Sequence, residues 1–111
     1  MAYMVVHLAG NNEIEFPLDK LPILYSDLDG IQDREAYVAL THESEWCLSI
    51  NPFGLLIWEN NMNELEESWY QEEVSKDLVL DLWKLLSEGN IKEIQNQSWL
   101  KGDPIYGIKQ V

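Results

Sequence analysis

Cysteines, histidines and basic residues are all scarce in this chain of 111 residues, and each shortage excludes a class of protein. Cys47 is the single cysteine, so an intramolecular disulfide and a zinc site built on several cysteines are both excluded. A lone thiol is most stable in a reducing compartment, which favours a cytoplasmic location. The two histidines, His7 and His42, lack the HExxH spacing of a metal-binding helix. The sequence therefore predicts no metal site.

The chain also lacks any long apolar run. No stretch approaches the roughly 20 apolar residues that a membrane-spanning helix needs. The first sixteen residues contain no basic region, and their apolar run is too short for a signal peptide. We therefore expect a cytoplasmic protein with no membrane partner.

The polar connection 26–35 superficially resembles a calcium-binding loop, because it contains three aspartates and a glycine. An EF-hand loop that starts at Asp27 needs an oxygen ligand at its fifth position, glycine at its sixth and glutamate at its twelfth. Those positions hold Ile31, Gln32 and Val38. The pattern therefore indicates a turn stabilised by aspartate side chains instead of a metal site.

Catalytic motifs are missing as well. The sequence contains no nucleophile elbow, no phosphate-binding Walker loop and no dinucleotide-binding glycine pattern. Cys47 and His42 are separated by a turn and could be neighbours on adjacent strands. However, Glu43 and Glu45 would disfavour the thiolate that a catalytic cysteine needs.

Adjacent carboxylates give no support for acid–base catalysis either. Glu66 with Glu67, and Glu72 with Glu73, are neighbours in sequence, and neighbours on a strand point to opposite faces. A carboxylate pair built from two different strands is not visible in a sequence. We therefore expect a protein that is not an enzyme and that uses no cofactor.

What the chain does contain is a three-stranded core over residues 36–60. Tyr37–Thr41, Trp46–Ile50 and Leu55–Trp58 are rich in β-branched and aromatic residues, and turn residues separate them. The second turn, Asn51–Gly54, has proline at its second position and glycine at its fourth. This segment predicts an antiparallel meander at the centre of a sheet.

A helix is predicted over residues 75–88. Ser75 is a good N-cap, Asp77 lies in the first turn where the helix dipole favours an anion, and Gly89 follows the last turn. Its polar residues form a narrow stripe, so the broad apolar arc must be covered on more than one side. We therefore predict a single α+β domain over residues 1–111, in which this helix covers one face of a mainly antiparallel sheet.

The N-terminal segments add a second hairpin. Tyr3–Ala9 and Glu13–Phe16 flank a Gly-Asn-Asn turn, which predicts two antiparallel strands. Leu21–Tyr25 is apolar but too short to assign to a helix or a strand.

The segments on either side of the predicted helix are less regular. Residues 62–74 fit neither a helix nor a strand cleanly, and we favour a fourth meander strand over Glu67–Glu73. Asn90–Trp99 is either a short helix or an extended arm. Ile105–Val111 could close the sheet as a last strand.

The net charge of −13 comes from 20 acids and 7 bases. Between Lys20 and Lys76 the one base is Arg34, whereas twelve acids occupy the same interval. Such a charge repels the phosphates of nucleic acids and anionic lipid surfaces, so we expect no nucleic-acid partner.

The densest part of this interval combines carboxylates with aromatic side chains. Carboxylates steer a basic partner toward a surface, and partly exposed aromatics are the anchors on which interface energy concentrates. By analogy of composition with immunity and inhibitor proteins, we expect a non-enzymatic acidic protein that docks on a basic protein. The expected contact residues are Glu59, Glu64, Glu66, Glu67, Trp69, Tyr70, Glu72 and Glu73.

Other classes of protein stay open. A small-molecule-binding or catalytic domain would have a sizeable cavity with converging polar groups between sheet and helix. A self-associating structural protein would use exposed strand edges or the surroundings of Trp99. The acidic surface also fits a solvated rim that does no more than keep the protein soluble.

Overall fold

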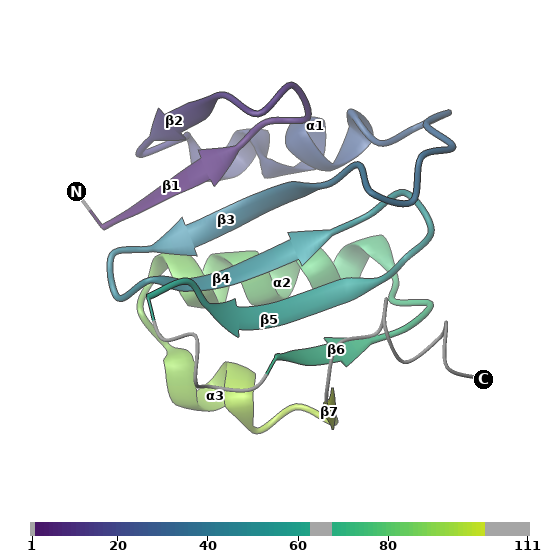
Figure 1. Ribbon diagram of the computed structural model, residues 1–111. Coiled ribbons are helices and arrows are strands. Elements are labelled where there is room, and N and C mark those ends of the chain that lie inside the picture. The colour runs from purple at the N-terminus through teal and green to yellow at the C-terminus, as the bar shows by residue number, and fades with distance from the viewer. Residues whose placement is uncertain (1, 63–67, 102–111) are drawn as a thin grey trace.

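In the part of the chain that the computed structural model describes, residues 2–62 and 68–101, seven strands form one antiparallel sheet (Figure 1). Their order in the sheet is β2-β1-β3-β4-β5-β6-β7, so the strands from β3 onward form a meander. The strands are β1 (Tyr3–Val6), β2 (Asn12–Ile14), β3 (Val38–His42), β4 (Trp46–Ile50), β5 (Leu56–Asn60), β6 (Trp69–Gln71) and β7 (Leu100–Lys101). The predicted α+β fold with an antiparallel meander is therefore confirmed.

The predicted meander core is the centre of this sheet, and its second turn is held by side-chain hydrogen bonds. The side-chain oxygen of Asn51 accepts hydrogen bonds from the backbone N–H groups of Phe53 and Leu55, both at 2.9 Å. Gly54 has a φ of 85°, and a Cβ atom there would lie 3.3 Å from the Cα of Glu73. Glycine is favoured at this position because its φ lies in the left-handed region, and the close approach of the chain that follows β6 leaves little room for a side chain.

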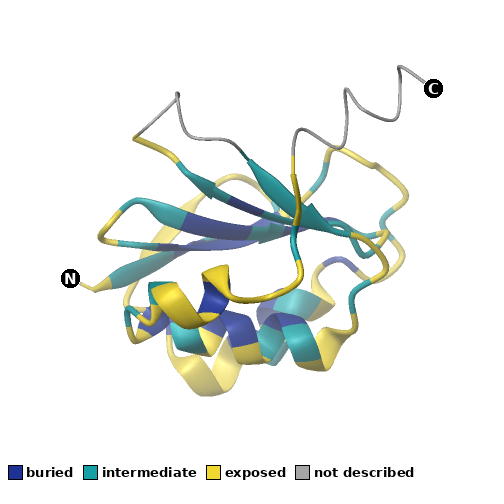
Figure 2. Ribbon diagram, turned by 90° about the horizontal axis from the view of Figure 1, so that it is seen from below, coloured by how far each residue is buried: buried dark blue, intermediate teal, exposed yellow. Residues whose placement is uncertain are grey.

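All helices of the described residues lie on one side of the sheet (Figure 2). They are the 3₁₀ turn η1 (Leu18–Lys20) and the helices α1 (Leu21–Ser26), α2 (Lys76–Ser87) and α3 (Ile91–Gln95). The hydrophobic core fills the space between sheet and helices. Its largest fully buried side chains include Trp58, Trp83, Leu40, Leu48 and Leu82.

Helix α2 forms as the sequence predicts. The Ser75 hydroxyl accepts a hydrogen bond from the Leu78 N–H at 3.2 Å, and Gly89 adopts a φ of 80° just after the helix. The indole N–H of Trp83 donates a hydrogen bond to the Leu48 carbonyl at 3.0 Å, which ties the helix to β4. Burial of its apolar arc dominates the stability of this helix, because each buried leucine contributes about 1.5–3 kcal/mol.

The less regular segments resolve into short elements. The N-terminal hairpin is present as β1 and β2, and Leu21–Tyr25 belongs to α1. The favoured fourth meander strand is present as β6, and α3 is the short helix within Asn90–Trp99. The last predicted strand, Ile105–Val111, lies outside the described residues.

Candidate functional site

The register of β5 and β6 separates the predicted contact residues onto two faces of the sheet. Residues that pair across antiparallel strands share a face. Trp69 pairs with Trp58 on the helix-covered face, whereas Tyr70 pairs with Ile57 on the opposite face. Glu59 alternates with Trp58 along β5 and therefore lies on the same face as Tyr70. Glu64, Glu66 and Glu67 lie outside the described residues.

The remaining predicted contact residues, Glu72 and Glu73, are exposed and follow β6. The backbone of Glu73 packs against Gly54, in the turn that precedes β5. Glu59 lies near the other end of β5, where its carboxylate accepts a hydrogen bond from the Ser68 hydroxyl at 3.3 Å. The structure thus places the described members of the predicted set in three locations and does not bring them into one cluster.

A different cluster is brought together by the helix-covered face, and it consists of tryptophans. Trp58 pairs with Trp69 across β5 and β6, and it also pairs with Leu48 of β4. Trp46 is two residues from Leu48 and so lies on the same face, diagonal to Trp58. Strands β4, β5 and β6 therefore present three indole rings in a row.

Trp99 completes the cluster from the chain that follows α3. Ile94 of α3 is fully buried in the core and fixes the helix against the sheet. The indole N–H of Trp99 donates a hydrogen bond to the Ile94 carbonyl at 2.7 Å, so the ring is held in place. The polar residues Gln95, Asn96 and Gln97 lie between these two anchors.

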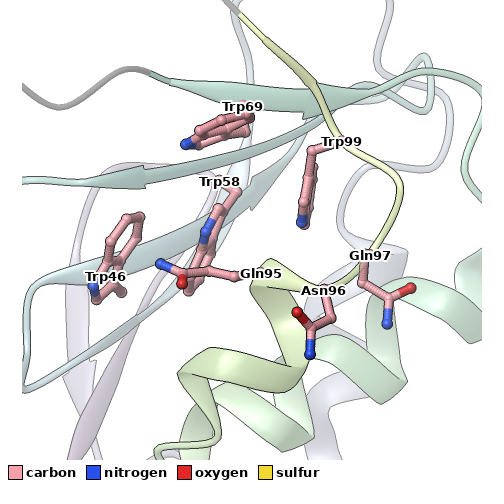
Figure 3. A pocket seen from close by; sticks show the side chains of 7 residues that line it. All are labelled: Trp46, Trp58, Trp69, Gln95, Asn96, Gln97 and Trp99. Carbon is pink, nitrogen blue, oxygen red and sulfur yellow. The ribbon is translucent and has the colours of Figure 1, made fainter.

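These seven residues line an open pocket of about 540 Å³, which we call the Trp pocket (Figure 3). The Trp46 and Trp58 rings stack with centroids 4.5 Å apart and planes at 13°. The centroids of the Trp58 and Trp99 rings are 6.3 Å apart, and the planes of the two rings meet at 17°. The lining residues are Trp46, Trp58, Trp69, Gln95, Asn96, Gln97 and Trp99. The pocket thus combines aromatic ring faces with side-chain amides between the sheet and α3.

One buried polar atom in the Trp pocket lacks a hydrogen-bond partner. The indole nitrogen of Trp58 is buried and makes no hydrogen bond with the described residues. A buried N–H without an acceptor costs about 1–3 kcal/mol. The side-chain amides of Gln95 and Asn96 are exposed and make no hydrogen bond with the described residues either. The pocket therefore has donors and acceptors that the described chain does not satisfy.

The protein's own bases neutralise few of the described carboxylates. The side-chain contact between a base and a carboxylate among the described residues joins His7 Nε2 to Glu13 Oε1 at 3.1 Å. None of the following bases pairs with a described carboxylate: Lys20, Arg34, Lys76, Lys84 and Lys92. The Nζ atom of Lys101 lies 5.6 Å from the centre of the Trp69 ring, so one ammonium group contacts the tryptophan cluster.

The helix-free face of the sheet carries a second open groove, which includes Cys47. Cys47 pairs with Thr41, whereas His42 lies on the helix-covered face, where its ring approaches Gly89. The two residues are therefore not the cross-strand neighbours that the sequence allowed. Burial raises the pKa of the Cys47 thiol to about 11, so it is protonated at neutral pH. A raised thiol pKa lowers the fraction of thiolate, which is the nucleophilic form.

The chain matches no protein-family model, no curated protein and no solved structure. Within residues 2–62 and 68–101, no group of three or more potential metal ligands comes together. None of the helices that the structure describes is both long and apolar enough to cross a bilayer.

Sequence reasoning missed the Trp pocket, although part of it was detectable. Alternation along two adjacent predicted strands places Trp46 with Leu48 and Trp58 with Leu56 on inward faces. The turn at Asn51–Gly54 then fixes their register and makes the two tryptophans diagonal neighbours. No signal in the sequence links Trp99 to this group, because its position depends on how α3 docks on the sheet.

Proposed function

We propose that this is a non-enzymatic acidic protein that docks on a basic protein partner, in the manner of an immunity or inhibitor protein. The observation that carries the proposal is an open aromatic pocket in a chain of net charge −13. The charge steers a cationic partner toward the protein, and the tryptophans provide the anchoring contacts. Two of the predicted glutamates, Glu66 and Glu67, precede Trp69 of this pocket by three and two positions in sequence.

The small number of contacts between the protein's own bases and its carboxylates supports the same proposal. If the carboxylates were matched by the protein's own bases, they would exert little attraction on a partner. The five described bases that make no ion pair leave most of the charge uncompensated. Exposed charge of this kind raises association rates and makes binding sensitive to salt.

Charge reversal tests whether position matters as well as total charge. The variant Glu66→Lys, Glu67→Lys, Glu72→Lys, Glu73→Lys is compared with a control that reverses four exposed acids elsewhere, Asp19, Asp27, Asp81 and Glu88. Both variants change the net charge by the same amount. Lysozyme serves as the basic probe, and its affinity is measured by titration calorimetry at low salt. We expect the first variant to lose at least about tenfold more affinity than the control.

Equal losses in the two variants would contradict the proposal, because total charge alone would then explain the binding. Circular dichroism of both variants provides the folding control. Since the reversed residues that the structure describes are all exposed, we expect both variants to keep the wild-type spectrum.

A second candidate function is the binding of an uncharged small molecule. The observation that favours it is the side-chain amide of Gln95, which points toward the tryptophan rings of the Trp pocket (Figure 3), since a few placed polar groups on an apolar wall are typical of ligand sites. A small-molecule site would not respond to reversal of the glutamates. The calorimetric comparison above therefore separates the two candidates.

A further inference from the structure

We propose that the Trp pocket binds an arginine side chain of the partner together with the main-chain carbonyl next to it. This inference rests on the proposed function and names the chemical group that the pocket recognises. It follows from the cationic contact already present in the cluster, from the flat ring faces beside the unpaired amide of Gln95, and from the indole N–H that lacks an acceptor.

A cation is the favoured occupant because of the ring faces and the overall charge. An indole ring attracts a cation through its negative face, and tryptophan is the strongest of the aromatic side chains in this respect. The Nζ atom of Lys101 already lies 5.6 Å from the centre of the Trp69 ring. The net charge of −13 raises the local concentration of cations around the protein.

Arginine fits the Trp pocket better than lysine does. A guanidinium is planar, stacks on aromatic faces and presents five N–H donors in its own plane. The carboxamide of Gln95 points toward the rings (Figure 3), and its oxygen is an acceptor that makes no hydrogen bond with the described residues. Lysine has a compact and strongly hydrated ammonium, which gains less from a flat wall of this kind.

The ring spacing determines where the guanidinium lies. A planar group placed between two rings at van der Waals contact needs about 7 Å between them. The Trp58 and Trp99 centroids are 6.3 Å apart, so this gap is too narrow. The guanidinium therefore stacks on an outward ring face of the pocket instead of entering between these two rings.

The unpartnered N–H of Trp58 requires an acceptor, and a guanidinium has none. A peptide carbonyl adjoining the arginine supplies one. Trp58 lines the pocket but is fully buried, so the acceptor must approach from the pocket side and move a neighbouring side chain aside to reach the N–H. A pocket of about 540 Å³ is within the range of ligand sites and has room for a side chain with its main chain.

Capped tripeptides test the requirement for charge. The probes are acetyl-Gly-Arg-Gly-amide and the same peptide with citrulline, which keeps the shape of arginine but is neutral. Binding to the full chain is followed by tryptophan fluorescence at low salt. We expect the arginine peptide to bind about tenfold more tightly than the citrulline peptide. Equal affinities, or no saturable change with arginine, would overturn the inference.

Two variants test the individual contacts. Gln95→Ala should weaken the arginine peptide several-fold, whereas Gln32→Ala, which changes an exposed glutamine elsewhere, should not. Trp58→Phe removes the unpartnered donor but keeps a ring. It should weaken the tripeptide by a several-fold larger factor than it weakens methylguanidine, which has no carbonyl and loses only part of its contact with the aromatic wall. Equal weakening of both probes would show that no carbonyl is bound there.

Failure of this inference is distinguishable from failure of the proposed function. If the arginine peptide does not bind but lysozyme affinity still depends on the glutamates, the pocket assignment is wrong and the docking proposal stands. If the peptide binds but the charge-reversal pair shows equal losses, arginine recognition stands and the docking proposal is wrong.

Discussion

Trp58 and Trp83 are both fully buried, yet their indole N–H groups have different surroundings. The Trp83 group donates a hydrogen bond to Leu48, so its role in joining α2 to the sheet is explained by structure alone. The Trp58 group has no acceptor among the described residues. A cost of about 1–3 kcal/mol is large for a domain whose total stability is about 5–15 kcal/mol. This contrast is the residue-level reason to regard the Trp pocket as a binding site.

Cys47 gives a pH-dependent prediction. Burial raises the pKa of its thiol from 9.0 to about 11, against smaller lowering effects from hydrogen bonds with Thr41 and Asn61. The unfolded chain therefore loses this proton at a lower pH than the folded chain. The thiol's contribution to stability is fully present below about pH 9 and is lost as the pH rises toward 11. We expect the free energy of unfolding, measured with urea, to fall by up to about 3 kcal/mol over this interval.

The variant Cys47→Ala isolates this effect. Tyr3 and Tyr25 have pKa values that are also raised, chiefly by burial, and they contribute a slope of the same sign in both proteins. The free energy of unfolding should therefore fall more steeply for the wild type than for the variant between pH 9 and 11. Identical slopes would mean that the thiol is not buried as described.

At the scale of the element, α2 provides the sharpest prediction. Ser75→Ala removes the hydroxyl that accepts from the Leu78 N–H and should destabilise the protein by about 1 kcal/mol in urea unfolding. Ser75→Asp keeps an N-cap acceptor and should remain within a few tenths of a kcal/mol of the wild type. A similar loss in both variants would show that the cap contributes nothing and that packing alone sets the position of the helix.

The elements differ in how far the sequence determined them. The meander and α2 were predictable because their signals are local: alternation, a turn with proline and glycine, a cap and an apolar arc. The segment of β6 was ambiguous because its strand state depends on pairing with β5, which is a tertiary contact. The class of Leu21–Tyr25 was open for the same reason, since only packing against the core distinguishes a short apolar helix from a strand.

The candidate site was predictable only in part. Composition indicated an acidic protein with aromatic anchors, and of the predicted contact residues Trp69 lines the Trp pocket. The sequence prediction grouped Trp69 with Tyr70, whereas in the structure these neighbours along β6 lie on opposite faces of the sheet. Trp46 and Trp99 come from segments that are remote in sequence, and only the docking of α3 on the sheet brings them together.

At the scale of the whole molecule, the sheet separates two surfaces. One carries the helices, the core and the Trp pocket, and the other is free of helices among the described residues. Trp99 is held by its hydrogen bond to Ile94 and packs against the core, so its ring is engaged within the chain. This arrangement favours a pocket for a partner's side chain over self-association through Trp99.

The most direct test follows the five indole N–H signals in a two-dimensional ¹H–¹⁵N spectrum as lysozyme is added to the labelled protein at low salt. The account predicts that the signals of Trp46, Trp58, Trp69 and Trp99 shift, because they line the docking pocket, while that of Trp83 stays in place inside the core. Raising the salt should reverse these shifts. Binding that leaves all four pocket signals unchanged would contradict the account.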